Sequence, residues 1–234
     1  MRLNKFLSSA GIAARRKCDE YIFEGKVKVN GETICEPGYQ VSEKDEILIG
    51  NKPVSPKNEH IYIVMNKPRG YVTTLSDEKG RKKVTDLIDI AERIYPVGRL
   101  DMNSTGVLLF MNDGELTHRL SHPKYGVTKT YRVKTHRAFD NKDLLLLEKG
   151  VKIKSGDIVK GKARIISPDR KHVEIKIKEG KKHQVKLMME SLGYIIESLD
   201  RIRYGNIKKS GLAKGMWRFL KKSEVERLQK LVGL

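Results

Sequence analysis

The chain has 234 residues, and its 48 lysines and arginines against 29 acidic residues give a formal net charge of +19, which predicts a polyanionic partner. Its two cysteines, Cys18 and Cys35, are too few for a disulfide framework and too far apart in the sequence for a paired-cysteine metal motif. No apolar run is long enough to cross a membrane and the first residues lack a signal-peptide pattern, so the sequence favours a cytoplasmic protein without a membrane partner.

The N-terminal fifty residues predict a small, self-contained α/β module. Its expected elements are helices over 3–10 and 13–24, a hairpin over 26–32 that turns at Asn30-Gly31, and a strand over 45–50. Residues 51–59 hold two prolines and several charges, which is typical of a linker. We therefore expect a first domain over residues 1–58, linker included.

The remaining residues, 59–234, predict an α+β domain. Strands are expected over 61–67, 94–100, 106–112, 129–135, 162–167 and 172–180, and helices near 84–90, 114–121, 140–149, 182–192 and 222–231. Several strands have short connections, which favours a mixed, mainly antiparallel sheet flanked by helices over alternating β-α-β units.

One acidic residue stands out in the segment YPVGRLDMNSTG, residues 95–106. If this segment were a strand, Arg99 and Asp101 would lie on the same side, and the nearby arginine would favour an ionised carboxylate. Gly98 and Gly106 allow the backbone to approach another chain or a ligand. The segment equally fits a loop between two strands, in which an aspartate is an ordinary turn residue. The residues alone leave both interpretations open.

Two further segments supply possible partners for this acid. Tyr131 lies between Lys129 and Arg132 in a predicted strand, where its ring either packs in the core or stacks on a nucleobase. Lys182 and Lys186 are four residues apart in a predicted helix and share a face that is solvated or contacts phosphates.

The sequence motifs give little support for a metal site or a nucleotide cofactor. His118 and His122 have the spacing of a helical metal pair, but Pro123 follows directly and no further ligand stands nearby in the sequence. No phosphate-binding loop motif of the Walker or dinucleotide type is present. We expect neither a metal nor a cofactor.

The N-terminal module carries exposed-looking cations that either contact phosphates or form a solvated surface. They are Arg2, Lys5, Arg15, Arg16, Lys26 and Lys28. The segment RLNKFLSSAGIAARRKCDEYIFEGKVKVNG, residues 2–31, resembles the small RNA-binding domain first known from ribosomal small-subunit protein four. This resemblance favours RNA binding.

The rest of the chain resembles one enzyme family. The segments that carry the likeness are NKPRGYVTT, GRLDMNSTGVLLFMNDGELTHRLSHPKY, KTYRV, EGKKHQVKLMM and RIRYGNIKKSGLAKGMWRFL. In this order they are similar to the bacterial rRNA pseudouridine synthases that carry the small N-terminal domain, over essentially the full chain. GRLD is the most diagnostic of them.

The resemblance implies isomerisation of a chosen uridine in folded rRNA without cofactor or metal. It makes Asp101 the catalytic aspartate and Lys186 its basic partner. It places Arg99 in the space vacated by the flipped nucleotide, and Tyr131 against the target base as a candidate for proton transfer. Further RNA contacts are expected from Lys67, Arg69, Lys129, Lys182 and His183.

The target within rRNA is less sharply implied. Segments 82–87, 114–125 and 201–207 favour a large-subunit target, whereas EGKKHQVK resembles the small-subunit enzymes. Relatives often have arginine at Lys186, whose bidentate geometry lysine lacks, and many have arginine at Leu187. The partner is expected to be rRNA or a ribosomal assembly intermediate, bound by a monomer. A non-catalytic assembly factor with the same fold is the alternative from another class, and a DNA-binding regulator is disfavoured because no convincing helix-turn-helix is present.

Overall fold

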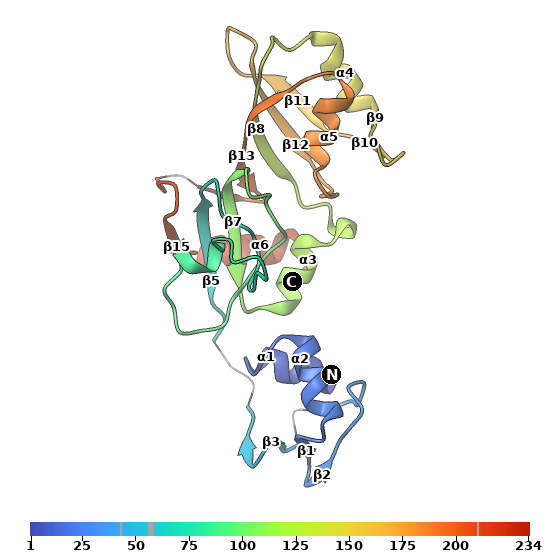
Figure 1. Ribbon diagram of the computed structural model, residues 1–234, viewed down its shortest axis with the longest axis vertical. Helices are drawn as coiled ribbons and strands as arrows, with labels where there is room; N and C mark the ends of the chain where they lie inside the picture. The colour runs from blue at the N-terminus through green and yellow to red at the C-terminus, as the bar shows by residue number, and fades with distance from the viewer. Residues whose placement is uncertain (43, 56–58, 210) are drawn as a thin grey trace. The chain divides into compact units, whose positions relative to one another are not determined.

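The computed structural model describes residues 1–42, 44–55, 59–209 and 211–234, which form two compact units (Figure 1). Unit 1 comprises Met1–His60 with Ile90–Arg93 and Asn112–Gly114, and unit 2 comprises Ile61–Asp89, Ile94–Met111 and Glu115–Leu234. The predicted domain boundary after residue 58 lies outside the described residues.

Unit 1 contains the predicted pair of helices and a small sheet. Its elements are α1 (Leu3–Ser9), α2 (Arg15–Phe23), β1 (Val27–Val29), β2 (Glu32–Thr33), β3 (Ile47–Ile49) and β4 (Lys52–Pro53), with strand order β2-β1-β3-β4. The hairpin turns where Asn30 and Gly31 both have positive φ, as this dipeptide predicts. The linker prediction was wrong for residues 52 and 53, because Gly50 adopts φ +51° and lets β4 fold back along β3.

Unit 2 is built on a mixed, mainly antiparallel sheet, which confirms the predicted α+β class. Its main strand order is β11-β12-β8-β13-β7-β5-β15, with β14 paired to β13 and β6 to β7. Only the β13–β7 pair is parallel among the described pairs. The strands are β5 (Tyr62–Lys67), β6 (Tyr95–Pro96), β7 (Thr105–Met111), β8 (Lys129–Thr135), β11 (Lys162–Ile165), β12 (His172–Ile177), β13 (Ile196–Tyr204), β14 (Ile207–Lys208) and β15 (Trp217–Phe219).

Helices and a short hairpin complete unit 2. They are a 3-10 turn (Val84–Leu87), α3 (Gly114–Ser121), a second 3-10 turn (Pro123–Tyr125), α4 (Asn141–Lys149), β9 (Val151–Lys152), β10 (Ile158–Val159), α5 (Gln184–Ser191) and α6 (Lys222–Leu231). Two predictions were too long: the strand over 94–100 shrinks to β6, and the helix over 84–90 to one 3-10 turn. Helix α4 starts where the Asp140 side chain accepts a hydrogen bond from the Lys142 amide, a capping arrangement typical of aspartate.

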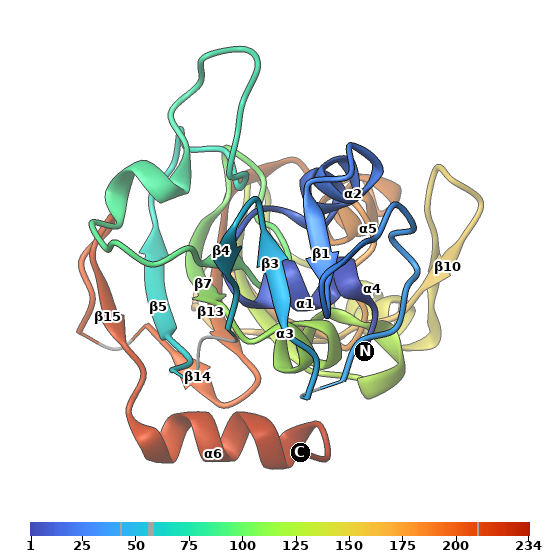
Figure 2. The same ribbon diagram turned by 90° about the horizontal axis from the view of Figure 1, so that it is seen from below.

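The sheet has a fully buried half and a half with one open face. β7 is buried on both faces, and its core includes Leu116 of α3 and Leu228 of α6; Figure 2 shows α6 alongside β14. In β12, by contrast, buried Val173, Ile175 and Ile177 alternate with more exposed polar residues. Helices α4 and α5 lie beside this half of the sheet (Figure 1). This difference leaves polar side chains of β8 and β12 facing solvent.

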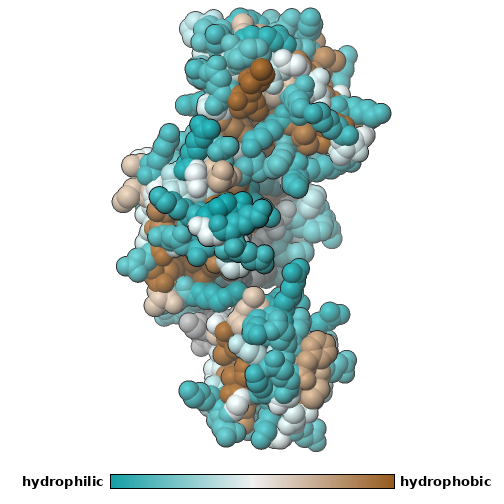
Figure 3. Space-filling model, viewed as in Figure 1, coloured by the Kyte–Doolittle hydropathy of each residue, from teal (hydrophilic) through white to brown (hydrophobic). Residues whose placement is uncertain are grey.

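The surface agrees with the high charge. Hydrophilic residues cover most of the face shown in Figure 3, and hydrophobic ones gather only in small patches. Both cysteines are free thiols, Cys18 buried and Cys35 exposed. Within the described residues, no helix combines the length and the apolar character that a membrane crossing requires.

Candidate active site

Asp101 lies in the loop between β6 and β7, three residues after the turn at Gly98, which has φ +67°. Because residues 97–104 form no strand, the loop interpretation is confirmed, and strand alternation does not align Arg99 with Asp101. The Asp101 side chain is 31% exposed. A carboxylate on a loop can act on a ligand only if the loop backbone is fixed. Side chains from elsewhere in unit 2 fix this loop.

Lys67, at the end of β5, holds the Asp101 loop from beneath. Its Nζ donates to the carbonyl oxygens of Asp101 and Ser104, both at 3.0 Å, and is within 3.3 Å of that of Met102. The Lys67 residue is 0% exposed, and burial lowers the pKa of its ammonium to about 8. The prediction that Lys67 contacts RNA was therefore wrong: it is a positioning residue, and its cost of burial is offset by these carbonyl contacts.

A second contact fixes the same loop. The Thr73 hydroxyl donates to the Leu100 carbonyl oxygen at 2.7 Å, and the Leu100 amide donates back to the Thr73 hydroxyl at 3.3 Å. The loop backbone is thus anchored on both sides of Asp101. Its carboxylate is the part left free to project outward.

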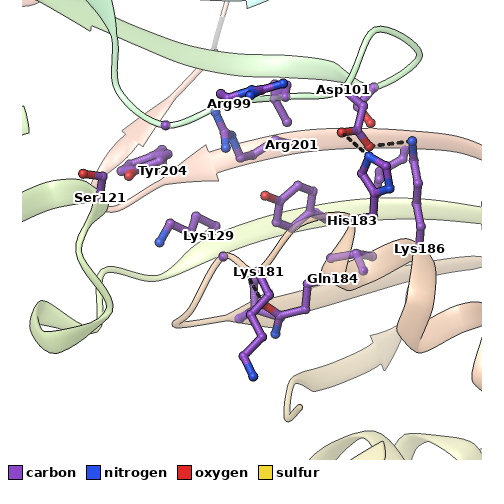
Figure 4. A pocket seen from close by; sticks show the side chains of 18 residues that line it. Arg99, Asp101, Ser121, Lys129, Lys181, His183, Gln184, Lys186, Arg201 and Tyr204 are labelled. Atoms are coloured by element: carbon purple, nitrogen blue, oxygen red, sulfur yellow. Dashed lines mark hydrogen bonds and ion pairs between the residues drawn. The ribbon is translucent and has the colours of Figure 1, made fainter. Parts of the chain in front are cut away.

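Two basic side chains from the start of α5 meet the Asp101 carboxylate (Figure 4). Lys186 Nζ lies 2.5 Å from Oδ2, and His183 Nε2 lies 3.2 Å from Oδ1. The ion pair with Lys186 agrees with the expected pairing. His183, expected as an RNA contact, is also a neighbour of the acid, and its side chain remains 46% exposed.

The start of α5 explains how both groups reach Asp101. His183 is the N-terminal cap residue and adopts φ +57°, which is uncommon for a residue other than glycine. Lys182 precedes the helix in a turn, so the expectation that it shares a helical face with Lys186 was wrong. Lys182 is exposed, as an RNA contact requires.

Asp101 stands at the rim of a pocket that is open to solvent. Tyr131, buried in β8, lines it, as do Arg99, Leu199, Gln184, Lys129, Arg201 and Tyr204. We call this the Asp101 pocket. In Figure 4 the acid and its two basic neighbours lie at one end, and Tyr204 and Ser121 at the other.

Arg99 is a lining residue rather than an ion-pair partner. In the described part of the chain Asp101 pairs with Lys186 and His183, and no ion pair with Arg99 is formed. Arg99 lines both the Asp101 pocket and a neighbouring hollow on the other side of the acid. The expected electrostatic support of Asp101 therefore comes from α5.

Arg201 of β13 is a pocket residue that the sequence reading did not single out. It is 2% exposed, and its Nε donates to the Val107 carbonyl oxygen at 2.7 Å. One terminal nitrogen is buried without a hydrogen-bond partner among the described residues, and the guanidinium lies over the Tyr204 ring, 5.0 Å from its centroid. The sequence signal was only the segment RIRYG, in which neither arginine is distinguished from the other.

Lys129 and Tyr204 form the far end of the pocket. Lys129 is buried, and desolvation lowers the pKa of its ammonium to about 8. Burial raises the pKa of Tyr204 to about 12, and the hydroxyl donates to the Leu120 carbonyl oxygen at 2.8 Å. Lys129 lines the Asp101 pocket, so its predicted RNA contact stays a prediction.

The remaining predicted contacts lie on the surface. Arg69 is exposed and its Nε lies 3.4 Å from the Asn103 oxygen, beside the Asp101 loop. The six cations of the N-terminal module, Arg2, Lys5, Arg15, Arg16, Lys26 and Lys28, are all exposed. Lys26 is paired with Glu24 at 2.6 Å.

His118 and His122, which have the sequence spacing of a helical metal pair, lie against each other. The ring centroids of His118 and His122 are 5.2 Å apart. Among the residues that the structure describes, no group of three or more histidine, cysteine, aspartate or glutamate side chains is placed to hold a metal.

Comparison with known proteins covers both units. Residues 61–191 match the family model described as RNA pseudouridylate synthase, and residues 1–47 match the S4 domain. An uncharacterized RNA pseudouridine synthase of Aquifex aeolicus (strain VF5) is 42% identical over 100% of this chain and 96% of its own length. Ribosomal large subunit pseudouridine synthase B of Bacillus subtilis (strain 168) is 41% identical over 98% of this chain and 96% of its own.

A solved structure gives the same result in three dimensions. The crystal structure of a pseudouridylate synthase superposes with a TM-score of 0.72 at 29% identity, and the match covers 97% of this chain and 99% of that one.

Proposed function

Because the chain belongs to the RNA pseudouridylate synthase family and is a pseudouridine synthase acting on RNA, we propose that it isomerises one specific uridine of large-subunit rRNA, with Asp101 as the catalytic aspartate. The observation that carries this assignment is the Asp101 carboxylate itself. It is held by Lys186 and His183 at the rim of a pocket lined by Tyr131 and Arg201.

The chemistry requires one carboxylate near the ribose. Cleavage of the bond from ribose C1′ to uracil N1 leaves positive charge on the sugar, which the Asp101 carboxylate stabilises, bonds to, or relieves by removing a sugar proton. The uracil turns in the pocket, its C5 bonds to C1′, the C5 proton is released, and N1 gains a proton. Atoms balance without an outside reactant, because the leaving base is also the nucleophile.

The pocket offers groups for the other steps. A uridine inside a folded RNA must leave its stack to reach Asp101, at a cost of roughly a few kcal/mol. Tyr131 has a ring positioned to pack on the extruded base and a hydroxyl for proton transfer. Arg99, exposed on the rim between two hollows, is placed to occupy the gap left in the RNA. Arg201 lines the same pocket, where its guanidinium would donate to a carbonyl oxygen of the uracil.

Large-subunit rRNA is the favoured target. The Bacillus subtilis relative, whose name specifies the ribosomal large subunit, is 41% identical across almost the whole chain. The S4 match over residues 1–47 supports attachment to rRNA through unit 1. We expect a cytoplasmic monomer that acts on rRNA or on an assembling ribosomal subunit.

Tritium release tests the assignment. The protein is incubated with rRNA labelled at uracil C5, both as naked transcripts and as partly assembled subunits. The wild-type protein is expected to release tritium, and Asp101→Asn to release it more than about a thousandfold more slowly, because the nearly isosteric amide lacks the negative charge.

The matched control is Asp89→Asn, since Asp89 is exposed and lines neither hollow beside Asp101. It should behave as the wild type. Equal release by Asp101→Asn would refute the role of Asp101, and no release from any rRNA by the wild type would refute the proposed substrate. Small-subunit rRNA as the sole substrate would refute the target preference.

A further inference from the structure

A second hollow lies on the face of the unit 2 sheet opposite to the Asp101 pocket. Tyr131 lines the Asp101 pocket, whereas its neighbours Thr130 and Arg132 line this second hollow, because successive side chains of a strand point to opposite faces. We call it the back groove. It is lined by Thr130, Arg132, Arg164, Glu174, Lys176, Ile202, Arg203, Lys208 and Lys209, which include six cations and one acid.

A β-bulge divides two arginines between the two faces. Arg201 and Arg203 are two residues apart and in a regular strand would point to the same side. The pairing of β13 with β8 shifts its register between Arg201 and Arg203. Arg201 therefore lines the Asp101 pocket while Ile202 and Arg203 line the back groove. Bulges commonly re-aim side chains at functional sites.

The back groove concentrates like charges across neighbouring strands. Lys176 pairs with Thr130, Thr130 with Arg203, and Arg203 with Lys208. This row runs over β12, β8, β13 and β14 and contains cations without an acid. Like charges directly opposite each other, as at Arg203 and Lys208, destabilise a sheet. An anionic partner bound along this row would offset the repulsion between its cations.

The adjacent row on the same sheet alternates in sign, and Arg164 and Glu174 form an ion pair in it. Arg164 pairs with Glu174, Glu174 with Arg132, and Arg132 with Asp200, so the signs alternate. Glu174 accepts two hydrogen bonds from Arg164, at 3.2 and 3.0 Å. The contrast shows that the all-cation row is not a general property of this sheet.

Three cations of the groove have no acid of their own. Among the described residues, no carboxylate lies within 4.0 Å of a charged nitrogen of Arg132, Arg203 or Lys208, whereas Lys209 is paired with Asp200 and Lys176 lies 3.9 Å from Glu174. All three are exposed. They are free to bind an external anion.

We propose that the back groove binds the sugar-phosphate backbone of an rRNA segment other than the one that enters the Asp101 pocket. This inference rests on the RNA substrate of the proposed function and adds a second contact face. The row from Lys176 to Lys208 crosses three strand spacings, about 14 Å in all. Since a nucleic-acid strand carries a phosphate roughly every 3.4 Å along its axis, several phosphates fit along the row.

The lining favours RNA over a protein partner. Protein interfaces have an apolar or aromatic centre, but Ile202 is the only apolar residue among those that line the groove in the described chain. Lysine and arginine side chains with few apolar neighbours instead suit phosphates, which require charge and hydrogen-bond donors.

The test is the salt dependence of binding to a large-subunit rRNA transcript. The full-length triple variant Lys176→Gln, Arg203→Gln, Lys208→Gln is compared with the wild type between 50 and 200 mM salt. Each lost phosphate contact lowers the slope of log affinity against log salt by about 0.7 to 0.9, so the slope should fall by about 2 to 3. In tritium release the KM should rise roughly tenfold or more with little change in kcat, because the groove contributes binding without chemistry.

A matched triple variant removes the same charge elsewhere: Lys149→Gln, Lys152→Gln and Lys230→Gln are exposed lysines outside both faces. Its slope should change by less than about 1. The groove variant should melt no earlier than the wild type, because it relieves like-charge contacts. If the groove variant has the same salt slope and the same KM as the matched variant, the proposal is overturned. The back groove would then be assigned to a protein partner. Because binding is measured directly, this result is independent of whether the wild type releases tritium.

Discussion

At the scale of single residues, the position of Asp101 depends on a lysine that never reaches the surface. Lys67 donates to three carbonyl oxygens of the loop from Asp101 to Ser104, so its ammonium is the fixed point from which the Asp101 carboxylate projects. Burial lowers its pKa to about 8, against the ordinary value of 10.5. The loop is therefore secured by a group whose charge is lost just above neutral pH.

This arrangement predicts opposite effects of alkaline pH on activity and stability. From pH 8 to 10 the folded protein loses the Lys67 proton while the unfolded chain keeps it, so unfolding takes up protons and the contribution of this group to stability rises with pH. Over the same range the neutral amine donates more weakly to the loop. We expect kcat to fall above pH 8 while the free energy of unfolding does not fall, as measured by tritium release and urea titration.

Lys129 is the matched comparison, because its pKa is also lowered to about 8. In Lys129→Met the normalised pH profile of kcat should keep its alkaline fall. Loss of that fall in this variant would assign it to Lys129 and contradict the role given to Lys67.

At the scale of elements, the site depends on the close approach of β7 to β13. Gly106 has φ +108°, and a Cβ atom there would lie 2.2 Å from the Arg201 carbonyl oxygen. The two strands are paired in parallel at this point, with Arg201 opposite Gly106. Glycine thus brings Arg201 next to the strand that follows the Asp101 loop.

Gly106→Ala is expected to be severely destabilising. Both the left-handed backbone and the contact with the Arg201 carbonyl disfavour a side chain, and together they should lower the free energy of unfolding by about 3 kcal/mol or more. Urea titration measures the change. Gly156→Ala is the control, because φ is +88° there but nothing lies within 4 Å, so only the backbone term of about 1–2 kcal/mol applies. Equal losses in the two variants would contradict the packing argument.

At the scale of the whole molecule, the excess of positive charge is distributed over several surfaces. Unit 1 exposes the six cations that were predicted to contact RNA. Unit 2 adds those of the Asp101 pocket and of the back groove. This distribution suits a large folded RNA better than a small anion.

Neutralising unit 1 should weaken binding without altering the chemistry. In Arg15→Gln, Arg16→Gln, Lys28→Gln, rRNA affinity at low salt should drop roughly tenfold and the salt slope should fall by about 2 to 3, because up to three phosphate contacts are lost. The kcat for tritium release at saturating rRNA should stay within twofold of the wild type. Affinity and slope equal to those of the Lys149, Lys152 and Lys230 triple variant would rule out a role for these cations.

Much of the fold followed from local pattern. The helices that became α3, α4 and α6 and the strands that became β5, β7 and β8 were predicted within a few residues, because each has strong apolar periodicity. β13 was missed, since its exposed and buried residues alternate irregularly around the bulge. β15 was missed because three residues form it only by pairing with distant β5.

The residues of the candidate site also fall into those that the sequence could identify and those that only the structure revealed. Asp101, Tyr131 and Lys186 could be named from the sequence, because they stand in motifs whose order and spacing resemble those of a known family. The support of Asp101 by His183, the burial of Lys67 and the separation of Arg201 from Arg203 could not be predicted, since each depends on a left-handed residue, a desolvated cation or a bulge.

The sequence by itself determined the class of the protein. Its positive charge predicted a polyanionic partner, and its motifs predicted an RNA-modifying enzyme. Only the tertiary structure decided which cations serve the carboxylate, which one supports its loop and which face away from it. The physical reason is that a cation's role follows from its burial and its neighbours, and these arise when strands distant in the chain pair and turn their side chains to opposite faces.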